Sequence, residues 1–180
     1  MGRLYEEVGD SSSTEEYAPR THFVDEWDRG AGFQVEGEGS NLIVLGMRKL
    51  LAALLGNQSG YVGVQYWAVG SGPVGGSLTS PAPPTTSDTR LAAELARVPV
   101  TIGFVDDFGK ATTGGAVSRN LQIQATFGPD VATGDNVEFA LFGGTATASA
   151  DTGIMLNRVT HPLKTKESWD SRRLTIVLSF

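Results

Sequence analysis

The chain has 180 residues with 20 acidic and 14 basic side chains, so its formal net charge is −6. It has no cysteine, which excludes disulfides, thiolate metal sites and cysteine nucleophiles, and its two histidines, His22 and His161, are too few for a three-histidine metal site. Residues 1–7 lack the apolar stretch of a signal peptide, and the longest apolar run, 42–55, is too short to span a bilayer. We therefore expect no targeting segment and no membrane partner.

The negative charge is concentrated near the N-terminus. Residues 1–40 carry a net charge of −7, whereas residues 41–180 carry +1, and no basic run indicates a nucleic-acid partner. The segment 1–40 lacks helical or strand periodicity, so a disordered acidic tail is one interpretation of it. Its recurring aromatic residues favour an extended arm that docks on another subunit. The candidate docking residues are Tyr5, Tyr17, Phe23, Trp27 and Phe33.

Residues 41–55 are predicted to form the one substantial helix. Ser40 is a suitable N-cap, and Gly56 is a suitable stop. The leucines between them cover much more than a narrow stripe, so we expect this helix to be buried against the sheet or against a symmetry-related subunit. Leu50 and Leu54 are the candidate docking residues on this helix.

After residue 60 the apolar pattern changes to period 2, which indicates strands that continue to residue 180. The expected strands cover residues 61–69, 98–105, 121–127, 137–141, 155–160 and 174–180. A loop without helix or strand is expected at 70–86, and a short helical turn at 91–97. The pattern predicts a mainly β domain over 41–180, either an antiparallel β-sandwich or an open barrel, preceded by the arm.

The motifs that suggest catalysis or cofactor binding are incomplete in this sequence. Residues 70–75 match G-x-G-x-x-G, but Pro73 removes an N–H and no helix follows, so a dinucleotide site is not expected. Residues 103–110 have the wrong spacing for a P-loop, and no nucleophile motif accompanies His161. We interpret the aspartates of the glycine-rich turns as solvated residues rather than calcium ligands. We expect no enzyme, no cofactor and no metal.

Four segments of the second half resemble a family of small structural proteins of tailed bacteriophages, described as tail-fibre-like or virion proteins. The first is a strand that ends in a glycine turn, followed by a Pro/Thr-rich loop, and the second has the form DTxLxxELxR. The third is a hairpin that begins ATF, and the fourth is an Arg-Val strand that leads to a final apolar strand. These segments are residues 65–72, 86–97, 125–144 and 155–180. The match spans about residues 60–180.

The resemblance implies a non-enzymatic virion component that contacts other virion proteins. We expect a tail, baseplate or head–tail attachment protein that forms a closed homo-oligomer, with a trimer favoured. A capsid decoration protein is the alternative within this class. A receptor- or glycan-binding module is the alternative from another class, with Tyr61, Tyr66 and Trp67 as stacking residues, although strand alternation puts Tyr66 on the opposite face from the other two.

Overall fold

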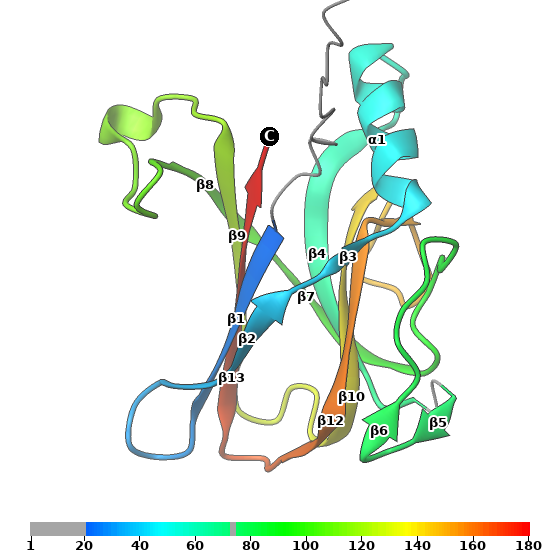
Figure 1. Cartoon of the computed structure of the whole chain (residues 1–180), viewed down its shortest axis with the longest axis vertical. Helices are drawn as coiled ribbons and strands as arrows, with labels where there is room; N and C mark the ends of the chain where they lie inside the picture. The colour runs from blue at the N-terminus through cyan, green and yellow to red at the C-terminus, as the bar shows by residue number, and fades with distance from the viewer. Residues whose placement is uncertain (1–20, 73–74) are drawn as a thin grey trace, which may run out of the picture.

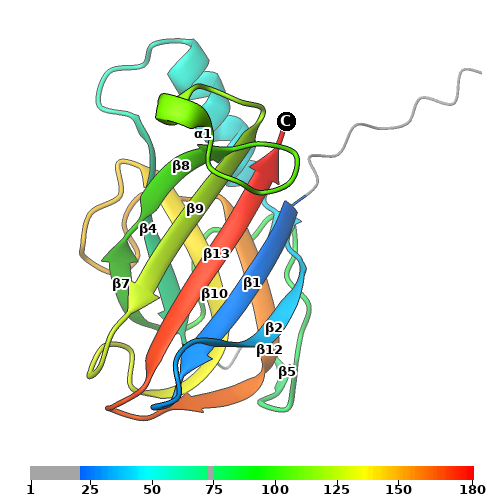
Figure 2. The same ribbon diagram turned by 90° about the vertical axis from the view of Figure 1, so that its left-hand side faces the viewer.

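Alternating apolar residues and glycine-rich turns fold this chain into two antiparallel sheets that face each other as a β-sandwich (Figure 1). The computed structural model describes residues 21–72 and 75–180. The first sheet has the order β2 (Gln34–Ser40), β1 (Thr21–Asp28), β13 (Ser171–Ser179), β9 (Asn120–Phe127) and β8 (Thr101–Val105), seen face-on in Figure 2. The second has the order β3 (Leu42–Ile43), β12 (Asn157–Lys166), β10 (Gly134–Gly144), β4 (Val62–Gly70) and β7 (Glu94–Pro99), and β11 (Ile154–Met155) also pairs with β10. The predicted mainly β, antiparallel sandwich is confirmed.

The main core lies between the two sheets. Inward residues of the first sheet alternate with polar neighbours along β9 and β13, as the sequence pattern predicts. They pack against large side chains from β4 and β10 of the second sheet and against two residues of the helix. The buried members include Ile123, Phe127, Leu174, Ile176, Trp67, Phe139 and Leu141, with Met47 and Leu50 from the helix.

The second sheet is covered on its outer face as well. On β10, Val137, Phe139 and Leu141 are buried, and so are the intervening Glu138 and Ala140. A smaller apolar cluster on that outer face contains Val44, Ala68, Leu91, Ala140, Phe142, Ala146 and Met155. The loops before β7 and after β10 supply Leu91 and Ala146, so these loops act as a third layer over the sheet.

The predicted arm boundary at residue 40 is wrong for residues 21–40, because these residues form β1 and β2 of the first sheet. β1 pairs with β13 along its whole length, from Thr21 opposite Leu178 to Asp28 opposite Ser171. Its inward residues alternate in the usual way, but one of them is Asp25, and this buried carboxylate interrupts the apolar pattern that identifies a strand. Residues 1–20 of the predicted arm lie outside the described residues.

The helix α1 (Leu45–Leu55) starts four residues later than predicted. Leu42 and Ile43 pair with β12 as the short β3, and the N-cap is Val44, not Ser40. Gly56 is the C-cap, as predicted. Only Met47 and Leu50 of the helix are buried, so in this chain the helix covers the sandwich with a narrow stripe rather than most of its circumference.

The segment between β4 and β9 also differs from expectation. No helical turn forms at 91–97, because Glu94–Pro99 is the edge strand β7 of the second sheet. The single strand expected at 98–105 is instead the end of β7 and all of β8, which belong to different sheets and are joined at Val100. The loop expected at 70–86 contains a small hairpin of β5 (Gly76–Ser77) and β6 (Ser80–Pro81). A one-turn 3-10 helix, Thr113–Gly115, lies between β8 and β9.

Gly46 sets how closely α1 approaches β11, and its replacement is a direct test of this packing. A Cβ at this position would overlap the carbonyl oxygen of Met155 and lie 2.8 Å from Cγ2 of Ile154. We expect Gly46→Ala to lower the free energy of unfolding by about 1–3 kcal/mol through overpacking, although alanine is intrinsically the better helix former. Urea unfolding measures the change. Gly103→Ala, where a Cβ meets nothing within 4 Å, is the control, and equal effects of both changes would contradict the packing.

Candidate interaction surface

The residues predicted to dock on another subunit have very different surroundings. Tyr5 and Tyr17 lie outside the described residues. Trp27 and Leu50 are 1 % and 2 % exposed inside their own chain, so the predicted docking role is wrong for both. Their burial follows from the strand and helix faces on which they lie, since each faces the interior of the sandwich.

The other three predicted docking residues are partly accessible. Phe23 is half-buried and packs edge-on against Phe139, with ring centroids 5.2 Å apart. Phe33 is half-buried beneath the guanidinium of Arg173, 4.2 Å from the ring centroid. Leu54 remains 37 % exposed on α1. Of the predicted docking residues that the structure describes, Leu54 is therefore the one best placed to meet a partner.

The three aromatic residues proposed for glycan stacking form no platform. Trp67 is fully buried in the core between the sheets. Tyr66 is half-buried on the outer face, where the guanidinium of Arg97 lies 5.9 Å from its ring centroid. Tyr61 precedes β4 and lines a hollow beside α1. A sugar ring therefore has no common aromatic surface to stack on at these positions.

Charged side chains that the sequence analysis did not single out form a buried cluster between the sheets. Asp25 on β1 accepts hydrogen bonds from Nε of Arg172 at 2.8 Å and from Nζ of Lys164 at 2.9 Å. The Arg172 guanidinium is fully buried, 5.0 Å from the ring centroid of Trp27 and 5.3 Å from that of Phe139. Because β1 and β13 belong to one sheet and Lys164 lies on β12 of the other, this cluster ties the two sheets together.

His161 completes that cluster in its neutral form. Its Nε2 lies 3.1 Å from a terminal nitrogen of Arg172, which is always a donor, so Nε2 accepts and Nδ1–H donates to the Pro162 carbonyl at 2.8 Å. Burial lowers the pKa of His161, and the positive charge of Arg172 lowers it further, to about 4 from the ordinary 6.5. Burial raises the pKa of Asp25, but Arg172 and then Lys164 outweigh this effect, and the net pKa is below its ordinary value.

We expect His161 to make the fold sensitive to acid. Its pKa is about 4 in the folded chain and about 6.5 in the unfolded chain, so the unfolded state binds more protons between these values. The free energy of unfolding should therefore fall as the pH is lowered from about 6.5 to about 4, by up to about 3 kcal/mol. Urea unfolding at a series of pH values measures this slope. His161→Gln should flatten it and His22→Gln, at an exposed position, should not; a slope unchanged by His161→Gln would contradict the assignment.

A second set of buried charges holds the outer loops on the second sheet. Glu138 is fully buried; its Oε2 accepts from Arg158 at 2.6 Å, and its Oε1 accepts from the N–H of Ala92 at 2.8 Å. Arg158 also donates to Asp88 at 2.8 Å. These contacts join β10 and β12 to the loop before β7, which lies more than 40 residues from either strand along the chain.

An ion pair with the same role lies next to it on the outer face. The side chains of Glu94 and Arg97 are each 2 % exposed and pair with each other. Arg97 also donates to the carbonyls of Thr147 and Thr152 and lies 4.5 Å from the ring centroid of Phe142. Asp88, Glu94, Arg97, Glu138 and Arg158 all belong to the segments that carry the sequence resemblance. The structure therefore brings three of those segments together at one surface.

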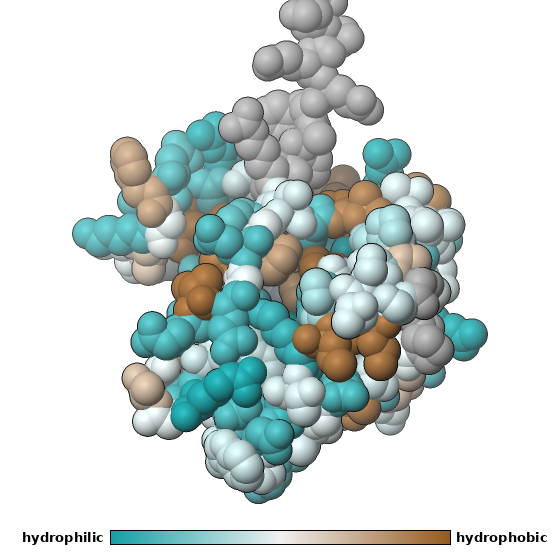
Figure 3. All heavy atoms as spheres, turned by 60° about the horizontal axis from the view of Figure 1, so that its bottom comes forward, coloured by the Kyte–Doolittle hydropathy of each residue, from teal (hydrophilic) through white to brown (hydrophobic). Residues whose placement is uncertain are grey.

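Several exposed apolar side chains lie on α1 and at the start of β4. Leu55 is 84 % exposed, and the other members are Leu45, Leu51, Leu54 and Val62 at the start of β4. We call these five residues the α1 surface. The end that comes forward in Figure 3 is mainly hydrophilic, with small separate hydrophobic areas. A concentration of exposed leucines on a polar protein is typical of a contact surface.

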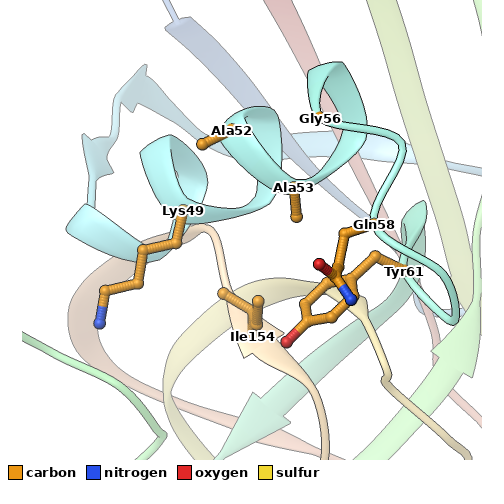
Figure 4. Close-up of a pocket in the computed structure, with 7 residues that line it drawn as sticks. All are labelled: Lys49, Ala52, Ala53, Gly56, Gln58, Tyr61 and Ile154. Atoms are coloured by element: carbon orange, nitrogen blue, oxygen red, sulfur yellow. The ribbon is translucent and has the colours of Figure 1, made fainter.

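A hollow of about 350 Å³ adjoins the α1 surface (Figure 4). Lys49 lies at one end, Gln58 and Tyr61 lie at the other, and Ile154 lies between them. The alanines of α1 on this side are small, which leaves room beside the helix; they are Ala52 and Ala53. The hollow is therefore lined about equally by polar and apolar atoms, with a positive charge at one end.

Neither a metal centre nor a membrane-spanning helix is found in the part of the chain that the structure describes. No three histidine or acidic residues in residues 21–72 and 75–180 are grouped so that they could hold a metal ion. In the same ranges no helix has the length and hydropathy needed to cross a membrane. Comparisons with protein-family models, with curated proteins and with solved structures found no match for this chain.

Proposed function

We propose that this protein is a non-enzymatic structural component of a tailed-phage virion, a tail, baseplate or head–tail attachment protein that binds other virion proteins and assembles in symmetric copies, most favourably as a trimer. The observation that carries the proposal is the α1 surface, because five exposed apolar residues on one helix and the start of one strand favour contact with a partner. The sequence resemblance of residues 60–180 supports the choice of a phage virion.

The buried charges on the outer face also support this choice. The segments that resemble phage proteins supply Asp88, Glu138 and Arg158 to one ionic cluster, so the resembling residues are those that build the sheet and its outer loops. Residues that build a fold in this way support a relationship in fold, whereas function depends on the surfaces that the fold presents. A capsid decoration protein remains the second candidate, because a small sandwich with an exposed end also fits a lattice.

Analysis of purified phage particles tests the proposed function. We expect mass spectrometry of the virions of the phage that encodes this chain to detect it as a constituent. A copy number of a few to a few dozen per particle supports a tail or attachment protein, and hundreds of copies support the decoration protein instead. Absence of the chain from purified particles would overturn both.

The α1 surface is also tested by substitution. Leu54→Glu combined with Leu55→Glu should leave the chain folded but weaken its self-association, because both side chains are exposed and charge opposes their burial at an interface. Leu50→Glu should instead unfold the chain, since Leu50 is in the core. Light scattering measures the mass and circular dichroism the fold. Leu78→Glu, an exposed leucine between β5 and β6, is the control; if the double variant associates like this control, the α1 surface is not the interface.

A further inference from the structure

The hollow beside α1 has the chemistry of a site for an aromatic side chain with acidic neighbours. Small and apolar side chains line its middle, and the polar groups of Lys49, Gln58 and Tyr61 lie at its two ends. The helix carries two positive charges, Arg48 and Lys49, and no acidic residue. Both are exposed, and neither has an ion pair with any residue in 21–72 or 75–180. Their charge is therefore available to an acidic partner.

Residues 1–20 of the chain match this chemistry. They contain five acidic and two basic side chains, a net charge of −3. Each of their two tyrosines adjoins a pair of glutamates, in the sequences Tyr5-Glu6-Glu7 and Glu15-Glu16-Tyr17. A tyrosine ring carries a large apolar area with a polar tip, which suits a hollow that has small and apolar side chains in its middle and polar groups at its ends. The neighbouring glutamates would then lie near the two bases of α1.

The place where residues 1–20 join the first strand is also consistent with binding near α1. These residues lead into β1, whose first residue, Thr21, donates a hydrogen bond to the Asn41 carbonyl at 3.3 Å, just before β3 and α1. β1 therefore begins at the α1 end of the sandwich (Figure 1). Twenty residues in extended form span about 60 Å, which is enough to reach the same end of an adjacent molecule.

From these observations we infer that residues 1–20 of one copy dock in the hollow beside α1 of a second copy, with a tyrosine in the hollow and its glutamates paired with Arg48 and Lys49. This inference rests on the proposed function in one respect, because assembly in copies supplies the second molecule. It adds which two parts of the chain are in contact, namely residues 1–20 and the hollow beside α1. Each copy both gives a segment and receives one, so the contact is heterologous and closes into a ring in a symmetric oligomer.

Two full-length variants, each defective in one partner of the contact, test the inference. The segment variant carries Tyr5→Ser and Tyr17→Ser, and the hollow variant carries Lys49→Glu and Ala52→Glu, both at exposed positions of α1. The control carries the same two changes on the loop between β8 and β9, Lys110→Glu and Ala111→Glu, which are also exposed. Circular dichroism establishes that all of them are folded, and light scattering over a range of concentrations gives their masses.

We expect the wild type and the control to associate alike, and each variant alone to associate about tenfold or more weakly. An equimolar mixture of the two variants should regain a one-to-one pair, because it retains one intact segment and one intact hollow. This pair should weaken with added salt, since exposed charges are screened over about 10 Å at 0.1 M.

Two results would overturn the inference. If the mixture stays monomeric, residues 1–20 do not dock on a second copy. Any effect of the variants would then come from docking within one chain. If both variants associate like the wild type, assembly uses another surface. The virion analysis above is independent of these results, so loss of this contact and loss of the proposed function are distinguishable.

Discussion

Replacing Asp25 by asparagine is expected to lower the free energy of unfolding by about 3–5 kcal/mol, the usual cost of leaving a buried charge without its partner. Asp25 is 2 % exposed and accepts hydrogen bonds from both Arg172 and Lys164. Asparagine has nearly the same size but no charge, so two cations would remain close together between the sheets. Arg172 is fully buried and has no route to water without separating the sheets.

Urea unfolding measures this effect, and two further variants show its origin. Asp107→Asn removes an exposed carboxylate that pairs with Arg119, and it should change the stability much less than Asp25→Asn does. Asp25→Leu combined with Arg172→Met removes both charges and should recover much of the lost stability. A double variant that is less stable than Asp25→Asn would contradict the view that the unpaired charge is the main cost.

The second large effect is expected for Glu138→Gln, at about 3 kcal/mol. Glu138 accepts two hydrogen bonds from Arg158 through Oε2, at 3.0 and 2.6 Å. A glutamine can still accept the N–H of Ala92, but its amide nitrogen would then face the donors of Arg158, with no proton acceptor between them. The half-buried arginine would keep only Asp88 as a counter-charge.

Loss of this contact should be visible locally as well as in the total stability. Hydrogen exchange should become faster at the amides of Ala92 and Ala93, because an amide oxygen is a weaker acceptor than the Glu138 carboxylate and Arg158 no longer links Asp88 of this loop to Glu138. Glu36→Gln, at an exposed glutamate on β2 that pairs with Arg29, is the matched control and should cost less than about 1 kcal/mol. Unchanged exchange at Ala92 and Ala93 would mean that the apolar contacts of Leu91 hold the loop without the charge.

These two clusters have different structural roles, and both lie apart from the α1 surface. The Asp25 cluster joins the sheets to each other, whereas the Glu138 cluster fixes a loop layer on the outer face of one sheet. Neither cluster involves the α1 surface, so changes there are expected to alter association without altering the fold. A change in association caused by variants of the α1 surface can therefore be attributed to the interface rather than to loss of the fold.

Local patterns in the sequence determined much of the sandwich. Strict alternation identified β9 and β13, and the buried inward positions Ile123 and Ile176 agree with it. Gly56 marked the end of α1 correctly, because a helix stop depends on the residues that adjoin it. In each case the pattern that predicts the element lies within a few neighbouring residues, even where the element pairs with a distant strand, as β9 does with β13.

Tertiary structure alone decided the remaining elements and the charged clusters. β1 escaped recognition because its inward position 25 is a carboxylate, and the arginine that makes this burial possible lies 147 residues away. Likewise, the pattern of β10 does not reveal that both of its faces are buried, because the covering loops come from other parts of the chain. The same reason explains α1: its leucines predicted burial all round, but which of them face the core depends on where β4 and β11 lie. A sequence pattern records each residue's own preference, whereas the pairing of distant charges and the choice of a helix face are set only when the sheets come together.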